Sequence, residues 1–177
     1  MADTDIITDE ELLKLPKDGY KRELVDGKIV VTPAGYRHGL VIVRLATRLA
    51  AFADLRDLGD VLDSSTGFRL PSRNLRVPDI SFVARGRVSE PPPKGFAELA
   101  PDLVVEVLSP DDSPRLVLDK VGEYLGAGAR LVWVIDPEIR RAAVYRSLTE
   151  VTQVATDGVL GGEDVLPGFS CPLAEIL

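Results

Sequence analysis

The chain has 177 residues, of which 45% are hydrophobic and 28% charged, and these values predict one globular domain over residues 1–177. The lone cysteine, Cys171, excludes an internal disulfide and favours a reducing compartment. The first eleven residues carry five acids and no base, and no apolar stretch approaches the roughly 20 residues of a membrane span. We therefore expect a cytoplasmic protein without a secretory signal.

The net charge of -7 argues against indiscriminate binding to nucleic acid. The charges are unevenly distributed, because residues 37–94 hold ten Lys or Arg against six acids, whereas residues 147–177 hold five acids and no base. A local basic face is therefore compatible with an acidic protein.

The first elements in the chain are a predicted short helix and a hairpin. Residues 8–15 carry Thr8 and Glu11 at the spacing of a helix capping box. Residues 22–25 and 28–32 are two β-prone runs separated by an Asp-Gly pair, which predicts a tight hairpin.

A long helix and a second hairpin follow. Residues 38–55 are predicted to be helical, and residues 67–70 and 77–83 are predicted strands that flank the turn-forming residues 71–74. The apolar face of the helix consists of side chains at helical spacing, namely Val41, Leu45, Leu49 and Phe52.

The second half of the chain predicts a β-α-β unit and a closing pair of strands. Residues 103–108 form an apolar strand, a helix starts after Ser113, and residues 131–135 form the next strand. Residues 141–146 and 151–155 predict an antiparallel pair. Because a crossover through a helix joins parallel strands, we predict an α/β (α+β) fold, with a mixed sheet flanked by helices and hairpins near both ends.

Two carboxylates interrupt the apolar strands. Asp79 lies within residues 77–83, and Glu106 lies within residues 103–108. A buried carboxylate costs several kcal/mol unless it is paired, and two carboxylates on adjacent strands would also repel each other. A divalent cation removes both penalties, and Mg²⁺ prefers carboxylate oxygens. The pair therefore predicts a Mg²⁺ or Mn²⁺ site.

A lysine on the helix after Ser113 is the third candidate. On a helical wheel Lys120 projects between Leu116 and Tyr124, at the edge of the apolar side, and can present its ammonium at the strand ends. The apolar side comprises Leu116, Val117, Val121, Tyr124 and Leu125, and the opposite side carries Arg115, Asp119 and Glu123.

Each candidate also has a structural interpretation. Asp79 could cap a strand or pair with Arg76, Glu106 could belong to an ion pair, and Lys120 could be a solvated lysine. Asp102, in a second Pro-Asp pair, is expected to begin its strand and remain solvated.

The segments around these residues resemble one known family. Asp79 in RVPDISFV, Glu106 in PDLVVEVLSP and Lys120 in LDKVGEYLGAG resemble the signature of the Uma-type (Uma-two) family, a branch of the PD-(D/E)xK restriction-endonuclease-like superfamily. The segments YKRELVDGKIVV, YRHGLVIVRLATRL, LVWVIDP and LPGFSCPLAEIL are also similar to that family, so the resemblance runs from about Tyr20 onward. The superfamily's lysine position is Leu108 here, and the resemblance implies that Lys120 replaces it.

The resemblance implies a restriction-endonuclease-like fold and a Mg-dependent DNA endonuclease. Asp79 and Glu106 would hold the metal, with the main-chain carbonyl of Val107 as a further ligand, and Lys120 would orient water or stabilise charge. The resemblance also implies a homodimer. Phosphate contacts are expected from arginines, namely Arg37, Arg69, Arg73 and Arg76.

Two further residues are candidates for the same site. The resemblance favours placing Glu23 near the active site, although a cross-strand pair with Lys28 is an equal alternative. His38, the only histidine, lies at the start of the long helix. It could be a surface or capping residue, or it could contact a phosphate or water beside the metal.

A different class of function fits the same residues. A nuclease-like fold without catalysis could serve as a binding or assembly module, and the acidic net charge favours that alternative slightly. The residues also do not distinguish DNA from RNA or a nucleotide as substrate.

Overall fold

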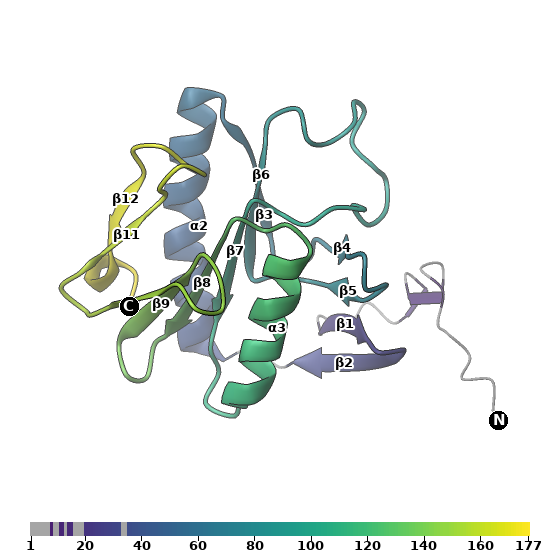
Figure 1. Ribbon diagram of the computed structural model, residues 1–177, viewed down its shortest axis with the longest axis horizontal. Coiled ribbons are helices and arrows are strands. Elements are labelled where there is room, and N and C mark those ends of the chain that lie inside the picture. The colour runs from purple at the N-terminus through teal and green to yellow at the C-terminus, as the bar shows by residue number, and fades with distance from the viewer. Residues whose placement is uncertain (1–7, 9–10, 13, 16–19, 33–34) are drawn as a thin grey trace.

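The computed structural model describes residues 8, 11–12, 14–15, 20–32 and 35–177 (Figure 1). A six-stranded mixed sheet in the order β10-β9-β8-β7-β6-β3 lies at its centre. Its strands are β3 (Gly59–Asp63), β6 (Ile80–Ala84), β7 (Leu103–Val107), β8 (Leu131–Asp136), β9 (Arg141–Tyr145) and β10 (Val151–Val154). The predicted mixed α/β class is confirmed.

The two long helices cover opposite faces of this sheet (Figure 1). Helix α2 (Tyr36–Arg56) buries Val41, Leu45 and Leu49 against one face, as its spacing predicted. Helix α3 (Pro114–Gly126) buries Val121 and Tyr124 against the other face. The strands serve both faces because successive side chains alternate in direction.

Strand β7 shows this alternation most clearly. Leu103 and Val105 pack in the core under α2, whereas Val104 packs in the core under α3. Glu106 continues the α3 series, so its carboxylate is directed to the side on which α3 lies. Strand β7 pairs in parallel with β8, which confirms the predicted β-α-β unit.

A smaller antiparallel sheet in the order β2-β1-β5-β4 lies beside α3. It consists of β1 (Lys21–Val25), β2 (Lys28–Thr32), β4 (Phe68–Arg69) and β5 (Leu75–Arg76). Asp26 and Gly27 have φ values of 49° and 74° in the first turn, as an Asp-Gly hairpin requires. The single register pair Leu24 with Leu75 joins the two hairpins.

The predicted hairpin of residues 67–70 and 77–83 is wrong, because β4 pairs with β5 and the strand at residues 80–84 belongs to the other sheet. The chain leaves β5 at Arg76, passes through Val77, Pro78 and Asp79 without strand pairing, and enters β6 of the other sheet at Ile80. Pro78 has no backbone N–H to donate to a ladder, so a strand cannot pair continuously through it. Asp79 therefore lies where the chain crosses between the two sheets.

Other details also differ from the sequence prediction, which has no strands at residues 159–161 and 170–172. Strand β3 was not predicted, although it pairs along its whole length with β6. Leu116 was assigned to the apolar side of α3 but is 67% exposed, because the first turn of the helix extends beyond the sheet core. Asp102 is buried rather than solvated; it accepts a hydrogen bond from the Ala84 amide and forms an ion pair with Arg87.

The chain ends on the face of the sheet covered by α2. After the predicted antiparallel pair β9 and β10, strands β11 (Val159–Gly161) and β12 (Ser170–Pro172) and a 3-10 turn (Leu173–Glu175) complete that core. Phe169 stacks on Trp133, and Cys171 is buried. Within the described residues, no helix is long and apolar enough to cross a membrane.

The predicted helix over residues 8–15 falls partly outside the described residues. The capping box itself is present, because the Glu11 carboxylate accepts from the Thr8 amide at 2.8 Å and the Thr8 hydroxyl accepts from the Glu11 amide.

Candidate active site

The two candidate carboxylates lie side by side where β6 begins and β7 ends. Asp79 immediately precedes Ile80, which pairs with Val105, and Glu106 is the next residue on β7. Both are buried, with side-chain exposures of 3% for Asp79 and 10% for Glu106. The crossing between the sheets and the β7 register together bring the two acids to one place.

Asp79 is held by three partners from three elements. Its Oδ2 accepts a hydrogen bond of 2.8 Å from the Val107 amide and lies 3.2 Å from His38 Nε2 of α2. Its Oδ1 contacts the ammonium of Lys21 at 2.7 Å. The alternative that Asp79 pairs with Arg76 is not what the structure has. His38 is not a surface residue, since its side chain is 11% exposed and directed at Asp79.

Glu106 lies between two lysines. Its Oε1 is 3.0 Å from Lys120 Nζ and accepts a 2.9 Å hydrogen bond from the Tyr124 hydroxyl. Its Oε2 faces Lys21 Nζ at 3.9 Å. Lys120 is therefore no solvated lysine; helix α3 presents both it and Tyr124, four residues later, to β7.

Glu23 on β1 completes the set of predicted residues. Its Oε1 is 3.1 Å from Lys120 Nζ and accepts a 2.8 Å bond from the Val77 amide, and its Oε2 is 3.3 Å from Arg76. The register opposes Glu23 to Val30 and Lys28 to Val25, so the cross-strand pair with Lys28 does not form. The structure thus brings Asp79, Glu106, Lys120, Glu23 and His38 together.

These residues and their partners form one network in which acidic and basic side chains alternate. Arg76 joins Glu23 to Glu123, whose Oε2 it contacts at 2.6 Å through Nε. Following the contacts from one end of the network to the other, its members are Glu123, Arg76, Glu23, Lys120, Glu106, Lys21, Asp79 and His38. Every buried carboxylate is therefore next to a cation, which offsets the repulsion and desolvation expected for an isolated pair.

The pKa values of the residues in this network follow from their pairing. Burial opposes the charge of Asp79, but the hydrogen bond from His38 and the charge of Lys21 outweigh it and lower its pKa. The pKa of Glu23 is also lowered. Burial would raise it, but the charges of Lys120 and then of Lys21 outweigh burial. Burial dominates at Glu106 and raises its pKa, although both lysines oppose this. The carboxylates around Lys120 overcome its burial and raise its pKa, so it remains an ammonium.

No three His, Cys, Asp or Glu side chains gather as a ready metal cage among the residues that the structure describes. The acids do not gather because lysines separate them: Lys21 lies between Asp79 and Glu106, and Lys120 lies between Glu106 and Glu23. The two acids nevertheless converge on a single cation, the Lys21 ammonium, so their donor oxygens fit a shared divalent ion in place of that group.

Sequence reasoning missed Lys21, Tyr124 and the role of Arg76. Lys21 and Glu23 are two residues apart on β1 and so share a strand face, and Tyr124 is four residues from Lys120 on α3. These spacings were the available signals. Arg76 was expected to contact phosphate, and that expectation is wrong, since it is buried between Glu23 and Glu123.

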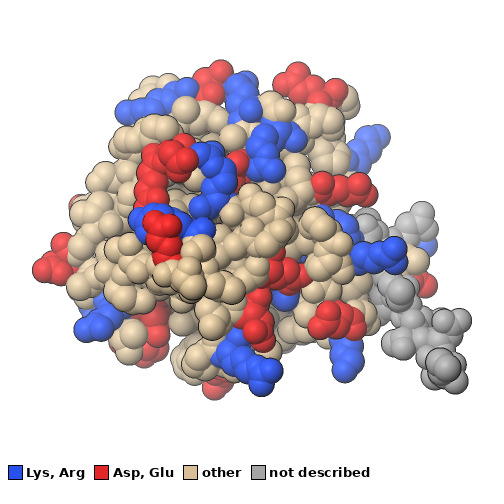
Figure 2. Space-filling view, viewed as in Figure 1, with Lys and Arg blue, Asp and Glu red and all other residues tan. Residues whose placement is uncertain are grey.

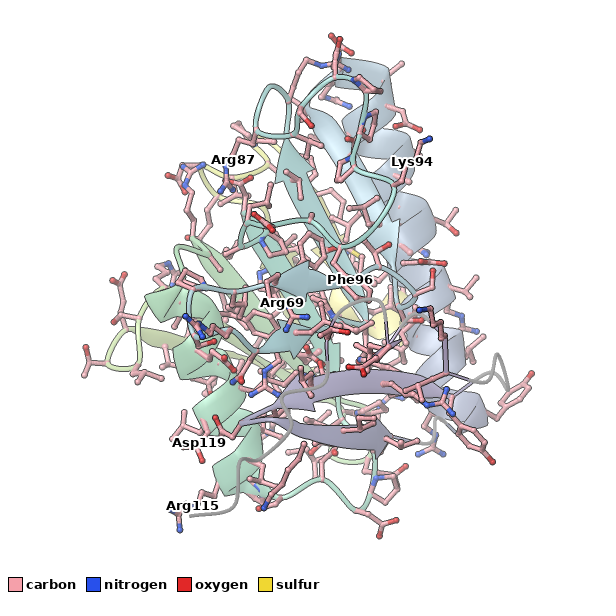
Figure 3. All side chains as sticks on the ribbon, turned by 90° about the vertical axis from the view of Figure 1, so that its right-hand side faces the viewer. Arg69, Arg87, Lys94, Phe96, Arg115 and Asp119 are labelled. Carbon is pink, nitrogen blue, oxygen red and sulfur yellow. The ribbon has the colours of Figure 1, made fainter. Side chains whose placement is uncertain are left out.

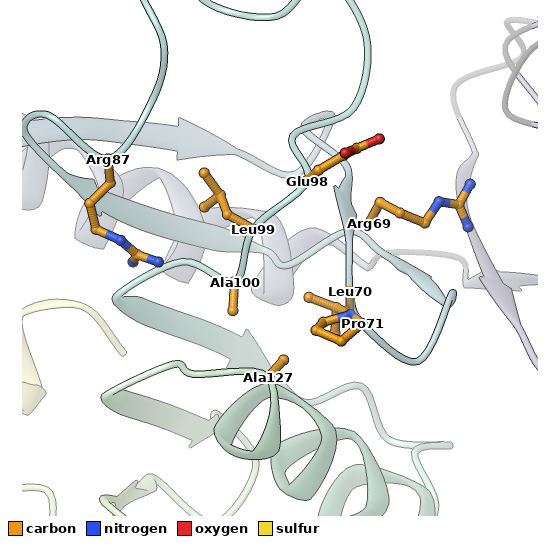
Figure 4. A pocket seen from close by; sticks show the side chains of 8 residues that line it. All are labelled: Arg69, Leu70, Pro71, Arg87, Glu98, Leu99, Ala100 and Ala127. Atoms are coloured by element: carbon orange, nitrogen blue, oxygen red, sulfur yellow. The ribbon is translucent and has the colours of Figure 1, made fainter.

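A cavity of about 470 Å³ lies away from these residues (Figure 4). Arg87 and Arg69 stand at its two ends, and Ala100 and Ala127 lie between them. Of the functional residues predicted from the sequence, only Arg69, an expected phosphate contact, lines it, and none of the candidate catalytic or metal-binding residues does. The candidate site is thus the partly open charge network, whose most exposed members are Lys120 and Lys21, with side chains 18% and 16% exposed.

The fold and the candidate site define a mixed α/β protein in which two buried carboxylates and a lysine lie together where β6 begins and β7 ends. Residues 9–174 match the Uma2 family, described as "Putative restriction endonuclease", and the chain belongs to that family. It is similar in fold to a putative nuclease of the DUF820 group from Anabaena variabilis ATCC 29413, whose crystal structure superposes with a TM-score of 0.82. The identity is 23%, over 96% of this chain and 97% of that one. No curated protein matches the sequence.

Proposed function

We propose that this protein is a Mg²⁺- or Mn²⁺-dependent endonuclease that hydrolyses phosphodiester bonds in DNA. The observation that carries the proposal is the convergence of Asp79 Oδ1 and Glu106 Oε2 on one cationic group, at 2.7 Å and 3.9 Å. Family membership supports the nuclease class.

Asp79, Glu106 and the main-chain carbonyl of Val107 would hold the metal ion. When bound there, the ion would polarise the scissile phosphate and make a nucleophile of water at neutral pH. His38 and the Val107 amide hold the second oxygen of Asp79, and Tyr124 holds the second oxygen of Glu106. These hydrogen bonds fix the direction of both carboxylates.

Lys120 would stabilise the charge that develops on the scissile phosphate. Contacts of 3.0 Å to Glu106 and 3.1 Å to Glu23 fix the position of its ammonium, so no reorganisation is needed during the reaction. Arg76 in turn fixes Glu23. Glu23 is therefore a positioning residue that acts through Lys120.

DNA would be held mainly through its phosphates. Arg37 is exposed, with its side chain 61% accessible, and Arg73 lies on the exposed turn between β4 and β5. Figure 2 shows Lys and Arg interspersed with Asp and Glu over the face viewed, so the molecule presents no single-sign surface there. With a net charge of -7, binding should be weak and should depend strongly on salt.

The deciding experiment compares cleavage of plasmid DNA and of DNA and RNA oligonucleotides with Mg²⁺ or Mn²⁺. The wild type should cut DNA, a chelator should stop it, and Glu106→Gln should be inactive. Glu150→Gln removes an exposed carboxylate from the loop before β10 and should cut like wild type. An active Glu106→Gln protein would contradict the assignment, and cleavage of RNA alone would correct the substrate.

The second candidate is a nuclease-like module that binds or assembles without catalysis. The fully paired network favours it, since a site of internal ion pairs can be purely structural. Calorimetric titration with Mn²⁺ separates the two, because such a module has no use for a divalent ion at Asp79 and Glu106.

A further inference from the structure

We propose that Lys21 is a displaceable counter-ion that occupies the place of the divalent cation and must leave when the cation binds. The inference rests on the proposed function and adds to it a residue whose role is to neutralise the two carboxylates until the ion binds. It also makes the apparent metal affinity depend on one side chain of β1.

The two oxygens of each carboxylate have different partners. Asp79 Oδ2 is occupied by the Val107 amide and His38, and Glu106 Oε1 is occupied by Tyr124 and Lys120. The remaining oxygens, Asp79 Oδ1 and Glu106 Oε2, both face Lys21 Nζ. Each acid thus has one oxygen fixed by the fold and one directed at the same ammonium.

The charge and size of an ammonium make it exclusive with a metal at this position. A divalent ion bound by both oxygens would stand where Nζ now stands, and the two positive charges would repel strongly in a site this buried. The Lys21 ammonium can move away without disturbing the strand, because a flexible stem of four carbons links it to the backbone. The backbone of Lys21 stays paired with Thr32 of β2. Its 16% exposure leaves it a route to solvent.

Lys120 differs from Lys21 in a way that predicts which lysine leaves. Lys120 Nζ lies 3.0 Å and 3.1 Å from two carboxylates, and one of them, Glu23, belongs to the fixed part of the network with Arg76 and the Val77 amide. Lys21 has one close contact, to the very oxygen that a metal needs. Metal binding should therefore release Lys21 and leave Lys120 in place.

The consequence is a linked equilibrium. Lys21 stabilises two buried carboxylates, so a metal that replaces it gains only the difference between its own interactions and those of Lys21. Replacing Lys21 by methionine, which keeps the length of the side chain, should destabilise the metal-free protein and tighten Mn²⁺ binding. We expect Mn²⁺ to bind about tenfold more tightly, which is about 1.4 kcal/mol.

The test measures Mn²⁺ affinity by calorimetry and thermal unfolding with and without Mn²⁺ for wild type, Lys21→Met, Lys120→Met and Lys28→Met. Lys28 is an exposed lysine of the same hairpin and controls for the loss of one charge. Lys21→Met should gain affinity and show the larger rise in melting temperature with Mn²⁺. Lys120→Met should gain much less, and Lys28→Met should match wild type.

A crystal structure of the wild type with Mn²⁺ gives a second measurement that needs no variant. Lys21 Nζ should have left Asp79 Oδ1, with Lys120 still on Glu106. A metal-bound structure with Lys21 still on Asp79, or Lys21→Met binding Mn²⁺ no more tightly than wild type, would overturn the inference and leave the metal site standing. If neither wild type nor Lys21→Met binds Mn²⁺, the proposed function fails with it.

Discussion

The Tyr124 hydroxyl donates a 2.9 Å hydrogen bond to Glu106 Oε1, and both residues are buried, one on α3 and the other on β7. The bond ties the helix that carries Lys120 to the strand that carries the acid. It therefore couples the position of the catalytic candidate on α3 to the metal-ligand candidate on β7.

Tyr124→Phe should retain the fold and weaken the site. Phenylalanine fills the same volume but leaves Glu106 with one donor fewer, so the free energy of unfolding should fall by roughly 1.5–3 kcal/mol, as for a lost bond to a charged acceptor. Urea denaturation measures this change, and Mn²⁺ affinity should fall in parallel. Tyr145→Phe on β9 is the control, and equal losses in both variants would show that the Tyr124 bond has no special role.

Asp79→Asn should abolish Mn²⁺ binding in calorimetry, as should Glu106→Gln, because each removes one charged ligand. Without metal, Asp79→Asn should also be less stable than wild type, since Lys21, His38 and the Val107 amide lose an anionic acceptor. Relief of carboxylate repulsion is not expected, because Lys21 already separates the two acids. Asp111→Asn in the exposed loop before α3 should be neutral. A stable Asp79→Asn protein that binds Mn²⁺ normally would remove Asp79 from the site.

Lys120→Met should lower the DNA cleavage rate by about two orders of magnitude or more, the effect of deleting one preorganised charge-stabilising group. Mn²⁺ affinity should change little or rise slightly. Stability should fall by roughly 3 kcal/mol, because Glu23 and Glu106 stay buried with one cation fewer.

Arg115→Met is the matched control on the same helix, where Arg115 and Asp119 extend away from the sheet (Figure 3). Normal cleavage by folded Lys120→Met would exclude the lysine from the reaction. It would leave the two-acid site unaffected.

Arg76 and Arg73 should behave oppositely when replaced. Arg76→Met should unfold more easily, because it leaves Glu23 and Glu123 without their shared cation. Arg73→Met should keep its stability, weaken DNA binding and reduce the slope of log affinity against log salt by about 1. Filter binding over a series of salt concentrations measures the slope. If folded Arg76→Met instead showed a lower slope of log affinity against log salt, Arg76 would be a phosphate contact after all.

A homodimer remains our prediction for the assembly. One site cuts one strand, so cleavage of both strands by a protein this small is easiest with two copies related by a two-fold axis. Light scattering at micromolar concentration should report twice the 19.2 kDa chain mass. A monomer mass under those conditions would contradict it.

The sequence by itself determined the long helix α2, the first hairpin, the β7-α3-β8 unit and the two acids. The period of α2, the Asp-Gly turn and the β7-α3-β8 unit are local patterns, and local patterns decide secondary structure wherever burial agrees with them. Asp79 and Glu106 could be recognised because a carboxylate in an apolar strand is costly and demands a partner.

Only the tertiary structure decided what those partners are. Lys21 lies 58 residues from Asp79 in sequence, and Arg76 lies 47 residues from Glu123, so no local spacing reveals either pair. The break at Pro78 moves Asp79 from the middle of an expected strand to the crossing between two sheets, where β1, α2 and β7 all reach it. Pairing between distant charges depends on how sheets and helices pack together, and that packing is a property of the whole fold.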